Sequence, residues 1–392
     1  MTYVRLLIAA IILATTASLA FAKDSPAAAG AGAGAGADTD KPLIQLAICL
    51  DTSNSMDGLI DQARSQLWTV VNELARTKRH GQTPSLQVAL YQYGNDTLSP
   101  QENWIQLILP FTDDLDKVSE KLFALKTNGG SEFCGAVLAS SLKQLQWSSS
   151  PDAYKVIFIA GNEPFTQGPI DFHEPCSSAK SRDIIINTIH CGPEQAGVAS
   201  GWRDGATLAN GIFMSIDTNT AVVAIAAPQD KDLAQLSTDI NKTYIPYGIQ
   251  GQEGAARQVQ QDVNATSTPA AASAGAVYTR AAAKGSGLYS NARWDLVDAI
   301  TQKQVKIEDV KEADLPEDLK KMTPDQRKQY VKEQTEKRAD IQKKIQDLSK
   351  AREDYIAAKR KEQATSQPTL DAAMLTAVHD QITKKNFEGA AK

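Results

Sequence analysis

The sequence predicts an α/β protein, in which a doubly wound, mainly parallel sheet is followed by a charged helical appendage. Between Lys41 and Tyr247, short apolar runs alternate with segments of helix length. The first run, residues 43–50, is apolar nearly throughout, as a strand covered on both faces is. Strands separated by helical crossovers form right-handed connections and a parallel sheet with helices on both faces.

Each element of the predicted sheet domain, residues 41–248, follows from its local pattern. The predicted strands cover residues 43–50, 86–93, 104–110, 154–160, 184–190 and 211–216. Residues 57–78 place apolar side chains from Leu59 to Leu74 on one helical face, and residues 115–125 and 133–145 are the other predicted helices.

The segment before the sheet domain has the features of an export signal. Residues 1–22 combine Arg5, an apolar run and the ending Ala20-Phe21-Ala22, which is typical of a cleaved secretory signal peptide. Residues 23–40 form an Ala/Gly-rich linker without a cysteine that could carry a lipid. We therefore expect an exported protein, periplasmic or secreted, with no integral membrane span after cleavage. An uncleaved amino-terminal anchor is the alternative.

The composition changes after residue 248. Residues 249–305 are an Ala/Ser/Gly-rich connection with predicted short helices, and residues 306–365 are a predicted charged helix or helical hairpin. Residues 366–392 are a predicted tail or short helix. Ile341, Ile345, Leu348 and Tyr355 stand at heptad-like spacing, but they cover barely two heptads. A solvated appendage and an oligomerising coiled coil, which would allow self-association, both stay open.

The net charge and the cysteine content limit which partners and which kinds of fold are compatible with the sequence. The formal net charge of -5 argues against nucleic acid as a partner. The four cysteines are too few for a disulfide scaffold. Cys134 with Cys191 is the first candidate disulfide and Cys176 with Cys191 the second, since connectivity does not follow from sequence. A zinc site built from these cysteines and nearby histidines is disfavoured, because oxidation competes with it in an exported domain.

The main candidate site follows the first predicted strand. Asp51, Ser53 and Ser55 offer only oxygen, and their alternate spacing lets the three side chains of one tight loop converge on a small hard cation. In parallel α/β sheets, ligands bind beyond the carboxyl ends of the strands, where this loop lies. The pattern therefore predicts a site for Mg²⁺, or for Mn²⁺ or Ca²⁺.

This pattern, D-x-S-x-S, resembles the metal-ion-dependent adhesion site of von Willebrand factor type A domains. The resemblance covers about residues 41–220 and includes Gly129-Gly130-Ser131 before a predicted helix, where the family has a Gly-Gly-Thr-like turn. It implies a Rossmann-like fold and a hydroxyl ligand at Ser131. It also implies a non-enzymatic module whose bound ion accepts an acidic side chain of a protein partner.

The third loop departs from the family pattern. The family usually has Thr-Asp-Gly after this strand, whereas this chain has Ala160-Gly161-Asn162-Glu163, so the usual aspartate is Gly161. Glu163 could replace the acid, Asn162 could supply a neutral oxygen, or the site could bind metal weakly. Asn162 and His190, the histidine at a strand end, are the candidate partner-binding residues. In the alternative, Asp51 and the serines bind no metal and only form hydrogen bonds with backbone groups of the turn.

Two functions of different classes follow from these observations. The first is an exported interaction or adhesion module that binds an acidic protein group through a divalent cation. The alternative is a structural envelope protein with a vestigial metal site, in which the carboxyl-terminal helices make the contacts. No recognised motif pairs a nucleophile with a base, so we do not expect an enzyme.

Overall fold

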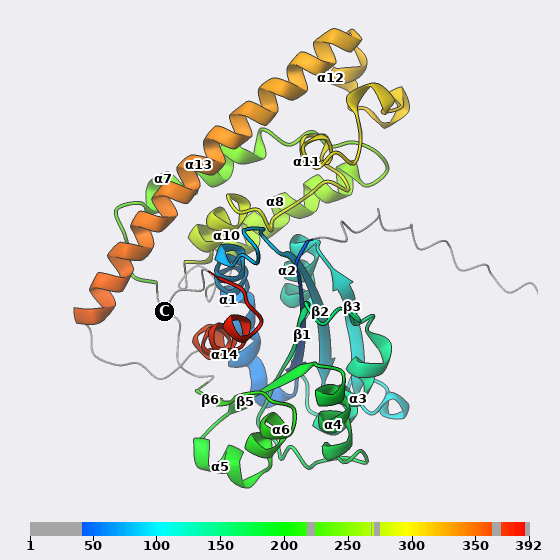
Figure 1. The fold of residues 1–392 in the computed structure, drawn as a ribbon, viewed down its shortest axis with the longest axis vertical. Helices are drawn as coiled ribbons and strands as arrows, with labels where there is room; N and C mark the ends of the chain where they lie inside the picture. Colours follow the sequence, from blue (N-terminus) through cyan, green and yellow to red (C-terminus); the bar gives the residue numbers. More distant parts are fainter. Residues whose placement is uncertain (1–40, 218–223, 268, 270–274, 363–369, 389–392) are drawn as a thin grey trace, which may run out of the picture. The chain divides into compact units, whose positions relative to one another are not determined.

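The predicted mainly parallel sheet is confirmed by the computed structural model, which describes residues 41–217, 224–267, 269, 275–362 and 370–388 (Figure 1). Six strands lie in the order β3-β2-β1-β4-β5-β6, and only β3 is antiparallel to its neighbour. Their bounds are β1 Leu43–Asp51, β2 Ser85–Tyr93, β3 Ile105–Thr112, β4 Tyr154–Gly161, β5 Ile185–Cys191 and β6 Phe213–Ile216.

One face of the sheet packs against α1 (Asp57–Arg76), α2 (Leu115–Ala124) and α14 (Leu370–Lys384). Alternate side chains of β1, such as Leu46 and Ile48, point into this layer because side chains alternate across a strand. They meet the apolar stripe of α1 that the sequence predicts, including Leu59 and Leu67.

The opposite face packs against α3 (Cys134–Gln144), α4 (His173–Ser181) and α6 (Trp202–Leu208), while α5 (Glu194–Ala199) lies beside α6. These helices cover the other side chains of the central strands, among them Ile157 and Ile159 of β4. The sequence does not predict α4, α5 and α6, because helices of two to three turns show too few apolar repeats to establish a helical period.

The helix α14 belongs to the sheet domain although it lies near the far end of the sequence. Met374 and Ile382 are buried in the same core layer as β1 and α1. The buried Gln381 amide donates to Asn187 Oδ1 on β5 at 2.6 Å, and its Oε1 accepts from Tyr154 Oη on β4 at 2.8 Å. These contacts make α14 part of the layer that covers the sheet (Figure 1).

A helical module lies between β6 and α14 in the chain. It includes α7 (Asp230–Asn241), α8 (Gly251–Ser267), α10 (Ala276–Lys284), α11 (Leu296–Thr301), α12 (Glu317–Lys320) and α13 (Pro324–Glu362). The helix α10 packs along α1, and α7 packs against both α10 and α13 (Figure 1). Short 3-10 helices occur at Asn54–Met56, Pro100–Glu102, Ile307–Asp309 and Glu312–Asp314.

The predicted charged helix is the 39-residue α13. Its heptad-like residues Ile341, Ile345 and Leu348 pack in one cluster with Leu233 and Ile240 of α7. This apolar seam is therefore covered within the same chain, and self-association through α13 would need a different face of the helix.

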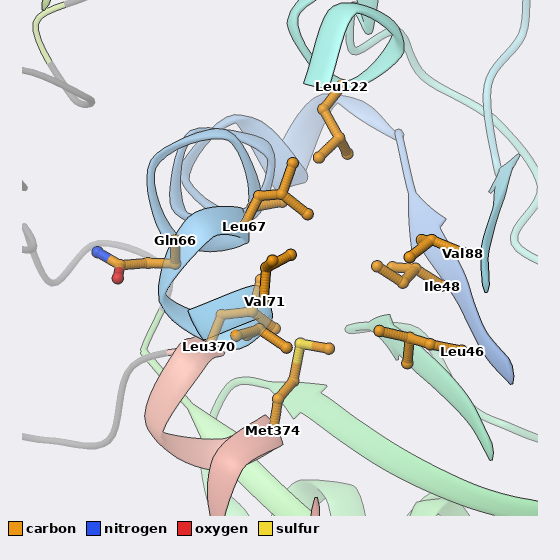
Figure 2. A pocket seen from close by; sticks show the side chains of 11 residues that line it. Leu46, Ile48, Gln66, Leu67, Val71, Val88, Leu122, Leu370 and Met374 are labelled. Carbon is orange, nitrogen blue, oxygen red and sulfur yellow. The ribbon is translucent and has the colours of Figure 1, made fainter. Parts of the chain in front are cut away.

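An apolar cavity lies between β1, α1, α2 and α14 (Figure 2). Leu46 and Ile48 line its sheet side, and Leu370 and Met374 line its helical side. The side-chain amide of Gln66 points away from it (Figure 2). A cavity without polar groups gives a ligand no directional contact, so this one is a gap in core packing.

Within the described ranges, no helix combines the length and the apolar run that crossing a bilayer requires. The predicted signal peptide and the Ala/Gly-rich linker lie outside those ranges.

Candidate functional site

The Asp51 loop is held by hydrogen bonds among its own side chains and backbone. The strand β1 ends at Asp51, and the backbone N–H of Ser53 donates to Asp51 Oδ1 at 2.8 Å. The hydroxyls of Ser53 and Ser55 lie 3.1 Å apart, and Ser55 Oγ donates to Asn162 Oδ1 at 3.3 Å. Asp51 and Ser53 are buried, while Ser55 is exposed, so the hydroxyl pair extends from the interior to the surface.

Two further loops are tied to the Asp51 loop by backbone hydrogen bonds. Thr52 N donates to Tyr93 O at the end of β2 (2.9 Å), and Thr52 O accepts from Asn128 N (3.0 Å). The buried Asn95 amide donates to Thr52 O and to Lys126 O. These bonds fix the residues after β2 and the Gly-Gly loop against the Asp51 loop.

A carboxylate that the sequence analysis does not single out, Glu132, lies beside Asp51. Its side chain is 6% exposed, and Oε2 has no hydrogen-bond partner. Gly94, at φ +73°, leaves the necessary space, because a Cβ there would lie 2.5 Å from Glu132 Cγ and 2.9 Å from Asp51 Oδ1. The only sequence signal for Glu132 is its position directly after Ser131, and it does not indicate in which direction the side chain points.

The two carboxyl groups are both perturbed by burial. Desolvation raises the pKa of Asp51 to about 7, with a smaller contribution from the negative charge of Glu163. Desolvation, followed by repulsion from Asp51 and Glu163, raises the pKa of Glu132 to about 8. Asp51 Oδ2 and Glu132 Oε2 are both buried without a hydrogen-bond partner. Two unpartnered carboxyl oxygens beside two hydroxyls fit a hard divalent cation, whose charge would offset the desolvation cost.

The third loop has no room for the usual aspartate. A Cβ on Gly161 would lie 2.5 Å from Tyr93 Oη and 3.1 Å from Asp51 Oδ2. The Tyr93 hydroxyl is held there because it donates to Ala160 O at 3.0 Å. The space that a side chain at residue 161 would need is therefore filled by the Tyr93 side chain, and only glycine fits there.

The other predicted site residues lie around this centre in different ways. Ser131 makes no hydrogen bond to the Asp51 loop within the described part of the chain. Glu163 acts on Asp51 and Glu132 through its charge, and its carbonyl accepts from Trp202 Nε1 at 2.9 Å. Asn162 reaches Ser55, as described above.

His190 lies beneath the third loop instead of at its surface. Its Nε2 is 3.3 Å from Asn162 O, the side chain is 3% exposed, and Nδ1 has no partner. Burial lowers the pKa of His190, which favours the neutral ring near pH 7. The imidazole supports the loop that carries Asn162, so Asn162 is the better placed of the two predicted partner-binding residues.

The structure differs from both predicted disulfides. All four cysteines are buried free thiols. Cys134 and Cys176 lie in the core layer of α3 and α4, whereas Cys191 lies in the layer of α1 and α14, across the sheet. Alternation along β5 turns the Cys191 side chain away from its predicted partners, which residue spacing alone does not reveal.

Among the described residues, no group of three or more His, Cys, Asp and Glu side chains gathers as a ligand set. The candidate centre has a different composition, because serine hydroxyls supply part of its oxygen donors.

Comparisons with known proteins find one matching family model and a number of similar solved structures. Residues 45–200 match the family model of the von Willebrand factor type A domain. No curated protein matches the chain. A solved structure of BatB from Bacteroides thetaiotaomicron is 14% identical, with 44% of this chain and 90% of that chain covered and a TM-score of 0.34.

Two further solved structures are similar over the same region. Proximal thread matrix protein 1 from the mussel byssus, with a zinc-occupied MIDAS motif, is 12% identical over 46% of this chain and 43% of its own (TM-score 0.36). The von Willebrand factor domain of a type V pilus tip protein from Porphyromonas gingivalis is 12% identical over 45% and 90% (TM-score 0.33). The family match, the sheet order and the Asp51 loop together identify a von Willebrand factor type A domain in this chain.

Proposed function

We propose that this protein is a non-enzymatic interaction module whose type A domain binds a divalent cation and, through it, an acidic side chain of a protein partner. The observation that carries the proposal is the pair of buried, unpartnered oxygens, Asp51 Oδ2 and Glu132 Oε2, beside the two serine hydroxyls. A buried carboxyl oxygen without a partner is costly, and a bound cation is a ligand that would satisfy it.

The first loop supplies the proposed ligands Asp51, Ser53 and Ser55. Ser131 is the proposed hydroxyl ligand from the second loop, and Glu163 is the candidate replacement for the missing acid of the third loop. An all-oxygen donor set suits Mg²⁺, Mn²⁺ or Ca²⁺. When bound, the ion supplies a positive charge that attracts a carboxylate. Asn162, next to Ser55, offers the arriving group a neutral polar contact.

The proposal also includes the cellular compartment in which the protein binds its partner. The signal-like residues 1–22 support export to the periplasm or beyond. The Ala/Gly-rich residues 23–40 would then serve as a tether between the cleavage site and the sheet domain.

A scaffolding function is the second candidate, and one observation favours it. Tyr93 fills the space beside Gly161, so the third loop has no carboxylate at the usual position. In that case the site would be vestigial, and α13 would make the contacts with its charged surface.

Thermal unfolding in EDTA and in millimolar Mg²⁺ or Mn²⁺ separates the two candidates. We expect the cation to raise the unfolding midpoint of the wild type and to leave that of Asp51→Ala unchanged, because a ligand bound only by the native state stabilises it. Asp325→Ala, at an exposed position of α13, is the control and should respond like the wild type. A wild-type midpoint that is insensitive to excess cation would favour the scaffold.

A further inference from the structure

We propose that Glu132 supplies the second carboxylate of the cation site, in place of the aspartate that type A domains usually carry where this chain has Gly161. This inference rests on the proposed function and deepens it by relocating a ligand from the third loop to the second.

The third loop is closed to a carboxylate at residue 161. Any side chain there begins with a Cβ, which would lie 2.5 Å from Tyr93 Oη. Real Cβ contacts are longer, so either the tyrosine or the loop would have to move. Tyr93 is 1% exposed and its hydroxyl is bonded to Ala160 O, which leaves it little freedom to do so.

The second loop instead directs a carboxylate into the site. Glu132 is held at its backbone, where its N–H donates to Gln167 Oε1 at 3.0 Å. Its Cγ lies against Gly94, where a Cβ would be 2.5 Å away, and the same Cβ would approach Asp51 Oδ1. Gly94 is thus the shared neighbour of the Glu132 side chain and of Asp51 Oδ1, and its missing side chain leaves room for both.

Each carboxyl of the pair keeps one oxygen without a partner. Among the described residues, Asp51 Oδ2 and Glu132 Oε2 are buried and accept no hydrogen bond. A buried carboxyl oxygen without a partner is costly. A bound cation would satisfy such oxygens, and the site would keep two carboxylates despite the glycine at residue 161.

The affinity for Mn²⁺ alone, measured by titration calorimetry at pH 8, tests the assignment on the full chain. We expect Glu132→Gln to weaken Mn²⁺ binding by about ten-fold or more. Glu163→Gln should weaken it less, and Glu194→Gln, at an exposed position, is the control. In EDTA, Glu132→Gln should keep one cooperative unfolding transition with a midpoint close to that of the wild type. This transition shows that the variant folds.

A relocation experiment sharpens the test. Tyr93→Phe removes the oxygen nearest to residue 161, so the combination of Tyr93→Phe, Gly161→Asp and Glu132→Gln restores a carboxylate to the third loop. We expect this combination to bind Mn²⁺ more tightly than Glu132→Gln alone.

The outcomes separate a failure of the Glu132 assignment from a failure of the proposed function. If Glu132→Gln binds Mn²⁺ like the wild type while Asp51→Asn does not, the ligand assignment is overturned and the proposed function stands. A larger loss in Glu163→Gln than in Glu132→Gln overturns it as well. If the wild type itself binds no Mn²⁺, both the assignment and the proposed function fail.

Discussion

At the scale of single residues, the chain buries two acids where a fold optimised for stability alone would bury none. Asp51 and Glu132 each keep one oxygen without a hydrogen-bond partner. Burial of such groups is destabilising, and strained or unsatisfied groups persist mainly where function requires them. The metal-free protein therefore carries a pH-dependent cost at this site.

We expect the metal-free protein to become less stable as pH rises from about 4 to about 8. The folded pKa values, about 7 for Asp51 and about 8 for Glu132, exceed the ordinary values of 3.8 and 4.5, so the native state holds more protons than the unfolded state in this range. Each group contributes at most about 1.4 kcal/mol per pH unit. Urea unfolding in EDTA at several pH values measures the slope.

The double variant Asp51→Asn/Glu132→Gln is the control for this slope, because other groups also titrate. It should lose part of the pH dependence. An identical slope in the wild type and the double variant would mean that these carboxyls ionise normally.

The site was predictable from sequence only where its geometry is local. Asp51, Ser53 and Ser55 share one loop, so their spacing already indicates convergence. The proposed role of Glu132 and the reason for Gly161 depend on Gly94 and Tyr93, which lie at the end of another strand and just after it. No pattern in the neighbourhood of either residue contains that information.

At the scale of elements, α14 shows that position in the sequence does not determine the layer in which a helix packs. The central strands β1 and β4 were predictable because they are apolar runs that the sheet buries. The carboxyl-terminal segment has its own apolar face, but nothing in it indicates that the partner is a sheet that begins at Leu43.

We expect Met374→Ala to destabilise the protein by about 2–5 kcal/mol. Met374 is 4% exposed and already lines the apolar cavity, so truncation enlarges a void that the surroundings do not fill (Figure 2). Denaturant unfolding measures the change. Thr376→Ala, at an exposed position of the same helix, should change stability by less than 1 kcal/mol. Equal effects of the two substitutions would contradict the packing of α14 on the sheet domain.

At the scale of the whole molecule, buried ion pairs join the helical module to the sheet domain. Arg280 of α10 is 1% exposed and contacts Asp116 of α2 at 2.6 Å and Asp262 of α8 at 2.5 Å. Tyr289 Oη donates to the other oxygen of Asp116 at 2.6 Å. A helix of the sheet domain and two helices of the module therefore share one guanidinium group.

We expect Arg280→Met to cost about 3–5 kcal/mol, because it leaves Asp116 buried without its positive partner. Arg293→Met is the matched control. Arg293 also pairs with an aspartate, Asp113, but its side chain is 55% exposed. Exposed ion pairs contribute about 0–1 kcal/mol. Denaturant unfolding compares the two variants, and a small effect of Arg280→Met would mean that water reaches the pair.

The position of α14 also sets the order in which the protein can assemble. A chain is made from its amino terminus, at roughly 5–20 residues per second. The first strand of the sheet starts at Leu43, whereas the helix that closes its core starts at Leu370. During synthesis this apolar layer of the sheet therefore stays incomplete until α14, which ends at Lys384, has been made. Until then the apolar side chains that α14 covers remain open to water, so the nascent chain depends on protection from aggregation.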